Sequence, residues 1–179
     1  MKTLKVSDVS GDTFDKNGRA SKGAPYLDIF ETEMTLWSDN RYTAKITVNG
    51  AIPARTDEPS NFIEWDVLID SDNNPSTGQI SSLLFNDIGV DYIIRFFLNG
   101  DKHGCSIVDV KTNESVSFPC PVHPNMREFT IFPKQIGEPA QFSFTIAVRE
   151  YGVAGDPTSL ITADKAPNQG HYIFPDGSY

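Results

Sequence analysis

The chain has 179 residues, of which 22% are charged and 39% are hydrophobic, and its formal net charge is −9. This composition is typical of a folded globular protein, and the length favours a single domain over residues 1–179. Nucleic acids and anionic membrane surfaces attract basic proteins, so the negative charge argues against both as partners. No stretch approaches the ~20 apolar residues of a membrane span, so membrane insertion is not expected.

The first acidic group lies in the segment SDVSGDTFDKNG, which includes Asp8 and Asp12, and Asp28 follows at the start of a strand candidate. Gly11 allows the backbone to turn so that Asp8 and Asp12 face one point. Carboxylates this close repel each other unless a cation neutralises them. The spacing fits a metal site that uses Asp8, Asp12 and Asp28, and it also fits salt bridges to the basic side chains nearby.

Two strands are expected next, over residues 27–37 and 41–49. Their apolar side chains alternate with polar ones, which is the period of a half-buried strand. Trp37 lies near the end of the first strand, where its ring can be exposed to a ligand.

The third strand candidate, residues 61–70, has the most regular alternation, with apolar side chains at every odd position from Ile63 to Ile69. This pattern places Trp65 in the core, although its ring is also a candidate for ligand binding. Glu64 and Asp66 fall on the opposite face, which we expect to be solvated.

The loop DSDNNPSTG follows this strand and has two interpretations. Asp, Asn, Pro, Ser and Gly are turn residues, so the loop can be a plain turn. Side-chain oxygens also recur at Asp70, Asp72, Asn74 and Ser76. Oxygens at alternate positions of a tight loop can converge on a hard cation such as Ca²⁺.

The loop is similar to the first half of an EF-hand but departs from it. Pro75 replaces the required glycine, and no helix is expected on either side. A further carboxylate must therefore come from elsewhere in the chain. Asp91, at the start of the next strand candidate, is the first choice, and Asp87 is the second.

Three more strand candidates follow, and the last two flank a hairpin turn. If Thr112–Asn113 is the centre of that turn, Cys105 and Cys120 face each other across the hairpin. A cross-strand disulfide would indicate an oxidising compartment. Two small buried thiols are the alternative. The three candidates are residues 91–100, 105–110 and 115–118.

The remaining strand candidates are residues 127–132 and 141–148, and PKQIGEP between them can form one helical turn. No segment of ten or more residues has a 3.6-residue period. Eight or nine strands without covering helices must bury their faces against each other. We therefore predict an all-β, two-sheet antiparallel β-sandwich, with a barrel as the second choice.

The order of several motifs resembles the DOMON-like superfamily, which includes the family 9 carbohydrate-binding modules. WDVLIDSDNNPSTG followed by GVDYIIRF is similar to its strand, turn and Gly-x-Asp-Tyr pattern. DVSGD with LDI resembles its opening, PKQIGEPAQFSFTIAV its segment before a final core strand, and ADKAPNQGHYIFP its closing segment.

The resemblance implies a sandwich of roughly ten strands with structural Ca²⁺ near the strand ends. Asp164, in ADKAP, could join the N-terminal group if the two ends of the chain lie together. The calcium ligands that the resemblance carries over are Asp70, Asp72, Asn74 and Asp91 in one group and Asp8, Asp12 and Asp28 in the other.

Sugar-binding members of such families stack exposed aromatic rings on the ligand, and Trp37, Trp65 and Tyr151 are the candidates here. The paired tryptophans of a family 9 module are not evident. We expect a non-catalytic, calcium-binding module that binds carbohydrate or acts in cell-surface adhesion. An extracellular or cell-envelope location fits best, although MKTLKVSDVSGD has no apolar core of a signal peptide, which also leaves a location inside the cell open.

Two alternatives remain. Paired carboxylates can hydrolyse glycosides, and Glu64 and Asp66 could act as acid or base in an acidic cleft. The chain has no other catalytic motif that we recognise. The second alternative is a purely structural interaction domain without ligand or activity.

Overall fold

The structure is a computed structural model that describes residues 1–80 and 87–175. These residues contain strands and short 3₁₀ helices but no α-helix, so the all-β prediction is confirmed. The 3₁₀ helices are η1 (Pro25–Leu27), η2 (Pro133–Ile136) and η3 (Pro157–Ser159). The strands are β1 (Lys2–Ser7), β2 (Ile29–Leu36), β3 (Tyr42–Val48), β4 (Phe62–Asp70), β5 (Tyr92–Asn99), β6 (Lys102–Asp109), β7 (Glu114–Phe118), β8 (Met126–Ile131), β9 (Phe142–Tyr151), β10 (Leu160–Ala166) and β11 (Tyr172–Phe174).

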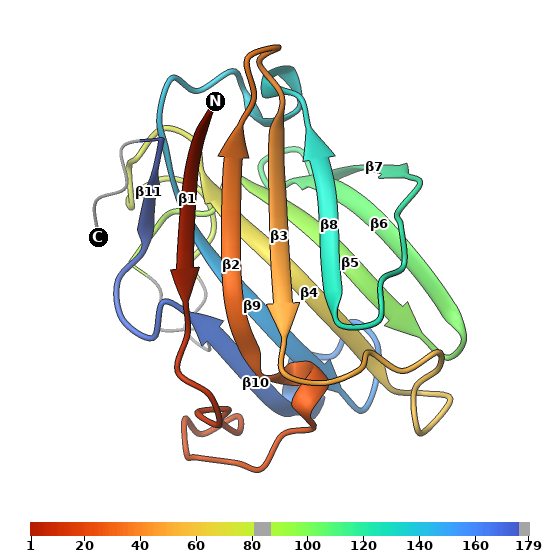
Figure 1. Cartoon of the computed structure of the whole chain (residues 1–179). Helices are drawn as coiled ribbons and strands as arrows, with labels where there is room; N and C mark the ends of the chain where they lie inside the picture. Colours follow the sequence, from red (N-terminus) through yellow and green to blue (C-terminus); the bar gives the residue numbers. More distant parts are fainter. Residues whose placement is uncertain (81–86, 176–179) are drawn as a thin grey trace.

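The strands form two antiparallel sheets that pack face to face as a sandwich. The four-stranded sheet has the order β1-β2-β3-β8. The seven-stranded sheet has the order β10-β9-β4-β5-β6-β7, and β11 pairs with the other end of β9. Figure 1 shows the smaller sheet in front of the larger one, with the strands of the two sheets crossing.

The core between the sheets is built from the alternating apolar side chains that the sequence indicates. Ile63, Trp65, Val67 and Ile69 of β4 are all fully buried, and they belong to one cluster with residues of both sheets. Burying a large apolar side chain contributes about 1.5–3 kcal/mol, so this cluster supplies the main stabilisation of the sandwich.

The outer face of the larger sheet is also buried in its middle. All residues of β9, and all of β4 except Phe62, are buried. The expectation that Glu64 and Asp66 face solvent is wrong, because these side chains are only 4% and 0% exposed. Loops pack over this face, so β4 and β9 are covered on both sides.

Two small apolar clusters lie on this outer face. The first contains Leu68, Ile88, Val90 and Ala147, with Phe14, Ile93 and Val110 packed against it. The second contains Tyr151, Leu160 and Ala163, with Phe14 and Phe62 packed against it. They are called the first and second outer clusters below.

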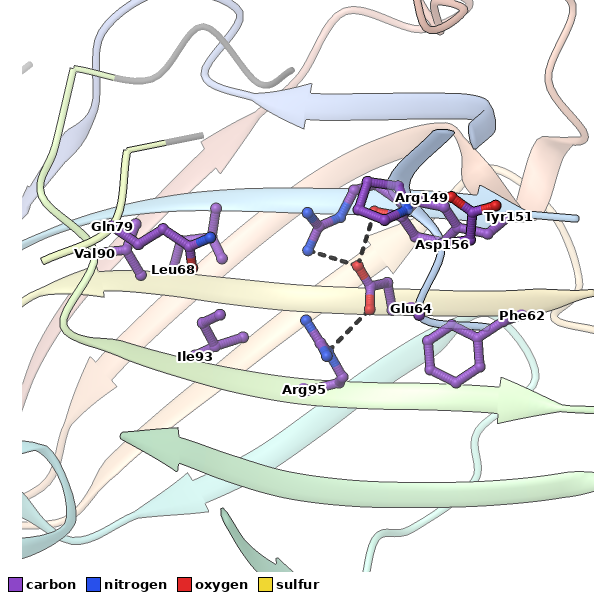
Figure 2. A pocket seen from close by; sticks show the side chains of 12 residues that line it. Phe62, Glu64, Leu68, Gln79, Val90, Ile93, Arg95, Arg149, Tyr151 and Asp156 are labelled. Atoms are coloured by element: carbon purple, nitrogen blue, oxygen red, sulfur yellow. Dashed lines mark hydrogen bonds and ion pairs between the residues drawn. The ribbon is translucent and has the colours of Figure 1, made fainter. Parts of the chain in front are cut away.

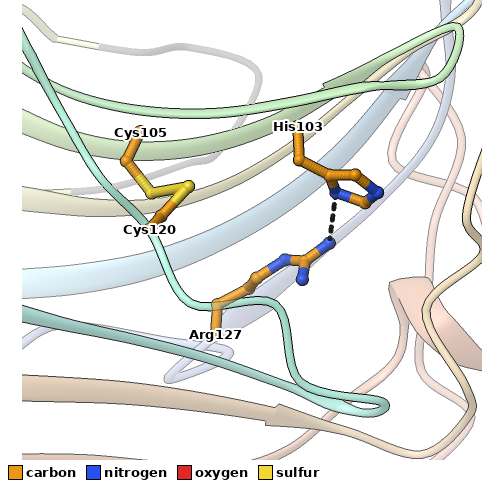
Figure 3. The surroundings of a disulfide bond; sticks show 4 residues. All are labelled: His103, Cys105, Cys120 and Arg127. Carbon is orange, nitrogen blue, oxygen red and sulfur yellow. Dashed lines mark hydrogen bonds between the residues drawn. A yellow bond between two sulfur atoms is a disulfide. The ribbon is translucent and has the colours of Figure 1, made fainter.

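Of the two alternatives for Cys105 and Cys120, the structure has the disulfide, with a Cα–Cα distance of 5.7 Å. The hairpin register differs from the expected one, because Cys105 pairs with Phe118 rather than with Cys120. Cys120 lies just beyond the end of β7, where the chain leaves for β8. The disulfide therefore ties this connection to β6, as Figure 3 shows.

A buried arginine lies beside the disulfide at the edge of the sandwich (Figure 3). Arg127 is 2% exposed, and its guanidinium carbon lies 4.6 Å from the centre of the Trp65 ring. Its side-chain hydrogen bond goes to Nδ1 of His103, at 3.3 Å. Burial lowers the pKa of Arg127 to about 10. Among the described residues no carboxylate forms an ion pair with Arg127, so a cation–π contact and a histidine hold this charge.

Candidate functional site

Three carboxylates from the two ends of the chain meet at one edge of the sandwich. Asp8 and Asp12 belong to the loop after β1, and Asp164 belongs to β10. One ligand atom from each lies within 4.8 Å of the others, and Asp164 is fully buried. These three residues are called the N-terminal cluster below.

Two oxygens of the N-terminal cluster are buried without a hydrogen-bond donor among the described residues. They are Oδ2 of Asp8 and Oδ1 of Asp12. The remaining oxygens have partners: Asp164 accepts from the backbone N–H groups of Ile29 and Lys165, and Asp12 Oδ2 accepts from Asn168. A buried acceptor without a donor is costly, so this arrangement fits a cation that these two oxygens would contact.

The electrostatics of the cluster point the same way. Burial raises the pKa of Asp164 to about 8 and the pKa of Asp8 to about 7, and the neighbouring carboxylates add to both shifts. Among the described residues, no basic side chain forms an ion pair with the three carboxylates. Salt bridges, the alternative to a metal site in the sequence analysis, are therefore not found at these three carboxylates in the described residues.

Asp28 was expected to be a ligand, but it is outside this group of three. Its carboxylate accepts hydrogen bonds from the backbone N–H of Gly11 at 3.0 Å and from the amide of Asn49 at 2.8 Å. Gly11 has φ +83°, the left-handed conformation that glycine adopts without strain. Asp28 thus holds the turn that presents Asp8 and Asp12.

A second group of carboxylates forms at the end of β4. Ligand atoms of Asp70, Asp72 and Asp91 lie within 4.8 Å of one another, as the sequence spacing suggested. This group is called the strand-end cluster below. Burial raises the pKa of Asp70, whose side chain is 1% exposed.

The strand-end cluster differs from the N-terminal cluster in its hydrogen bonds. Asp70 accepts from the backbone N–H groups of Gly89 and Asn74, at 3.1 Å each. Asp91 accepts from Ser71, and Asp72 accepts from Asn74 and from the hydroxyl of Thr77. These contacts are those of a hydrogen-bonded turn, the first interpretation of DSDNNPSTG. A cation at this end of β4 stays a prediction.

The other predicted ligands of this group have different contacts. Asn74 uses its side-chain oxygen to accept from the backbone N–H of Ser76, and Ser76 is exposed. Asp87 is also exposed, and its carboxylate lies 2.9 Å from Nδ1 of His171. Of the four carboxylates proposed here, the described structure brings together Asp70, Asp72 and Asp91.

A cavity of about 400 Å³ lies on the outer face of the seven-stranded sheet (Figure 2). Its floor is formed by β4, β5 and β9. One end is apolar, with Leu68, Val90 and Ile93, and the other end has Phe62 and Tyr151. The remaining lining residues are Glu64, Gln79, Arg95, Arg149, Gly155, Asp156 and Pro157.

Two arginines and two carboxylates form an ion-pair network at the centre of this floor. Glu64 lies between Arg149, at 2.6 Å, and Arg95, at 3.0 Å, as Figure 2 shows. Asp66 pairs with the same two guanidinium groups. Tyr151 donates its hydroxyl hydrogen to Glu64 at 3.3 Å. Two positive and two negative charges compensate each other, which explains how these groups tolerate burial.

Burial raises the pKa of Glu64, and the nearby Asp66 raises it further, while the two arginines oppose the shift. The arginines also hold both carboxylates in fixed positions. The result is a set of hydrogen-bonding groups that ion pairs hold in place at the floor of the cavity.

An aromatic pair continues the cavity wall. The rings of Phe62 and Phe97 stack with their centres 5.7 Å apart and their planes at 25°. Phe97 lies over Gly104, where a Cβ atom would be 2.2 Å from the ring. Glycine at this position therefore allows the ring of Phe97 to lie flat beside Phe62.

The three aromatic residues expected to bind a ligand have different environments. Tyr151 lines the cavity. Trp65 is fully buried in the core, so its ring has no face for a ligand, and the core interpretation is the correct one. Trp37 is 40% exposed beyond the end of β2 in the other sheet, where its indole N–H donates to Thr43. Ligand binding by Trp37 stays a prediction, and it would not involve the cavity.

Sequence reasoning missed Arg95 and Arg149 as site residues. Arg95 of β5 lies opposite Asp66, and Arg149 of β9 lies opposite Glu64. These pairs depend on the register of β4 with its two neighbours. The arginine within the mostly apolar strand β5 was the available signal.

No family model matches the chain, and neither a curated protein nor a solved structure matches it. The resemblance to the DOMON-like superfamily therefore stays a prediction. In the described residues, no helix has the length and apolar character to cross a membrane.

Proposed function

We propose that this chain is a non-catalytic carbohydrate-binding module that Ca²⁺ stabilises. The sugar site is the cavity on the outer face of the seven-stranded sheet. The observation that carries this assignment is the arrangement of Glu64 between two guanidinium groups, next to apolar and aromatic walls. The calcium site is the N-terminal cluster.

The chemistry of the cavity suits a sugar because a pyranose ring has both polar and apolar surfaces. Hydroxyl groups donate and accept, so they pair with carboxylates and guanidinium groups held in place. The C–H face of the ring packs on Phe62 or on the aliphatic end of the cavity. Glu64 and Asp66 balance the two arginines, so the ligand we propose is a neutral sugar rather than an acidic one.

The proposed calcium site rests on two carboxylate oxygens, Oδ2 of Asp8 and Oδ1 of Asp12, that have no donor in the part of the chain that the structure describes. Ca²⁺ takes 6–8 oxygen ligands and accepts irregular geometry. The carboxylates of the cluster would supply part of this shell. The bound ion would also compensate the negative charge that burial makes unfavourable. The resemblance stated above implies the same metal.

The disulfide between Cys105 and Cys120 supports a location outside the reducing cytosol. We therefore assign the module to the extracellular space or the cell envelope. Such a location also supplies Ca²⁺ at the millimolar concentrations that suit extracellular calcium sites.

The test of the sugar site is binding of neutral oligosaccharides on a glycan array, followed by calorimetry of the positive sugars. Phe62→Ala should weaken binding about tenfold, which corresponds to about 1.4 kcal/mol. Phe132→Ala is a matched control, since this phenylalanine is 53% exposed and is not part of the cavity lining. Equal loss in both variants, or none in either, would place the sugar elsewhere.

The same sugars test the enzymatic alternative. An enzyme would release shorter products, and Glu64→Gln would abolish this turnover while calcium binding remained intact. Binding without turnover supports the proposed module. Absence of both binding and turnover would leave the purely structural interaction domain.

A further inference from the structure

The loop that carries Asp8 and Asp12 also reaches the outer face of the larger sheet, through Phe14. The backbone N–H of Phe14 donates to the carbonyl of Ala163, and the N–H of Ala163 donates to the carbonyl of Phe14, at 2.8 Å each. This isolated antiparallel bridge places Phe14 against β10. The loop is thus attached to the sheet at one defined point.

Phe14 connects the two outer clusters. Among the described residues it is the one side chain that packs against both. Leu68 and Val90 of the first outer cluster line one end of the cavity, together with Ile93, which packs against that cluster. Tyr151 of the second outer cluster lines the other end, together with Phe62, which packs against it. A change in the position of Phe14 therefore reaches both ends of the cavity.

The N-terminal cluster lies on either side of the same bridge. Asp12 precedes Phe14 by two residues, and Asp164 directly follows Ala163. Adjacent side chains of a strand point to opposite faces, so Asp164 points inward to the cluster while Ala163 points outward to Phe14. A cation bound by Asp12 and Asp164 would join the two backbones that the bridge joins.

We propose that cation binding at the N-terminal cluster controls the ligand cavity through Phe14. This inference rests on the proposed function, of which it describes the regulation. Without the cation, repulsion among Asp8, Asp12 and Asp164 opposes the contact between the loop and β10. With the cation, the bridge is held, and Phe14 fixes the two outer clusters and hence the cavity walls.

Coupling between two sites is reciprocal, so a sugar that binds the cavity must tighten Ca²⁺ by the same factor by which Ca²⁺ tightens the sugar. We expect this factor to be about fivefold or more. The cavity walls need not touch the ion for this effect, because Phe14 contacts both outer clusters.

The decisive experiment uses CaCl₂ alone and measures amide hydrogen exchange by mass spectrometry. The readout is the segment 151–157 at the rim of the cavity, which is distant in sequence from Asp12 and lies at the end of the β9–β10 hairpin opposite to Asp164. In the wild type, Ca²⁺ should slow exchange there at least fivefold. Phe14→Ala should lose this response while calorimetry still detects Ca²⁺ binding, because Phe14 supplies no ligand atom.

Three further variants serve as controls. Asp12→Asn should lose both Ca²⁺ binding at the N-terminal cluster and the response of the rim. Asp72→Asn changes the strand-end cluster and should keep the response. Val9→Ala changes an exposed apolar residue of the same loop and should also keep it.

The outcomes separate this inference from the proposed function. If Ca²⁺ binds but slows exchange only in residues 8–15, or if Phe14→Ala responds as the wild type does, the coupling is overturned and the calcium site stands. If calorimetry detects no Ca²⁺ binding to the wild type, both the calcium site and the coupling fail. Slowed exchange at the rim that depends on Phe14 supports the coupling whether or not a sugar has been found.

Discussion

Replacement of one proposed calcium ligand should stabilise the protein when no calcium is present. In Asp8→Asn, the side chain keeps one oxygen for its backbone hydrogen bond and gains an NH₂ group in place of the buried oxygen without a donor. This NH₂ group can donate to Asp12, whose Oδ1 also has no donor among the described residues. The variant removes one buried negative charge, replaces the unpaired oxygen of residue 8 and can give Oδ1 of Asp12 a donor.

The magnitude follows from the pKa of Asp8, which burial raises from 3.8 to about 7. Keeping this carboxylate ionised near pH 8 costs up to roughly 4 kcal/mol, at 1.36 kcal/mol for each pH unit. The side chain is partly exposed, and solvent screening reduces the figure to about 2 kcal/mol. For a chain of this length, that corresponds to a rise of about 4–8 °C in Tm.

The pH dependence has a definite sign. Because the folded pKa is raised, the contribution of Asp8 to stability is fully present below pH 3.8 and is lost as the pH rises towards about 7. The advantage of Asp8→Asn in a chelator should therefore be large near pH 8 and small near pH 4. Addition of Ca²⁺ should reverse the order, since a hundredfold excess over Kd stabilises the wild type by about 2.7 kcal/mol.

The assay is thermal unfolding followed by circular dichroism, with EDTA or with excess CaCl₂, across this pH range. Asp101→Asn, in the exposed turn between β5 and β6, is the control for removal of one charge. The reasoning is refuted if Asp8→Asn melts below the wild type in EDTA near pH 8, or if Ca²⁺ raises the Tm of both proteins equally.

Three predictions concern the edge of the sandwich near β6 and β8. Reduction of Cys105–Cys120, whose sequence separation is 15, should cost about 3 kcal/mol and lower Tm by roughly 6–12 °C; an unchanged melt in reductant would contradict the role of this tether. Arg127→Met should change stability by less than about 1.5 kcal/mol in urea unfolding, because methionine still packs on Trp65 and the variant removes a buried charge that has no carboxylate partner among the described residues. Arg127→Ala should cost about 3 kcal/mol, and equal losses in the two variants would argue against this account. Burial and the neighbouring Arg127 lower the pKa of His103, so the wild type should lose stability as the pH falls below about 6.5, and His103→Gln should show a smaller loss in melts compared at pH 5 and 7.5.

Much of the fold follows from local patterns. The strands with regular alternation, such as β3, β4, β5 and β9, were found because one face of each packs in the central core. The helical turn expected in PKQIGEP is present as η2. The three strands without a clear pattern, β1, β10 and β11, were missed.

Each missed strand has a physical reason. β1 lies at the edge of its sheet and is mostly exposed, so few of its side chains need to be apolar. In β10, the buried residues include Asp164 and Lys165, so burial is not matched by hydrophobicity. β11 has only three residues, which is too short for any period.

The candidate sites depend on contacts between distant segments, which one sequence does not define. Local spacing identified Asp70 with Asp72, and Asp8 with Asp12. The third carboxylate of the N-terminal cluster is Asp164 and not Asp28, and its place there depends on how β10 lies beside the N-terminal loop. The burial of Glu64 and Asp66 depends on arginines from two neighbouring strands, and strand register places these opposite each other.

The composition of the N-terminal cluster also sets when it can form during synthesis. Asp8 and Asp12 are made before Asp164, which follows nine of the eleven strands that the structure describes. The proposed calcium site at the N-terminal cluster would therefore be incomplete during the early steps of folding. At this proposed site, calcium would stabilise the sandwich only after most of its strands have been made.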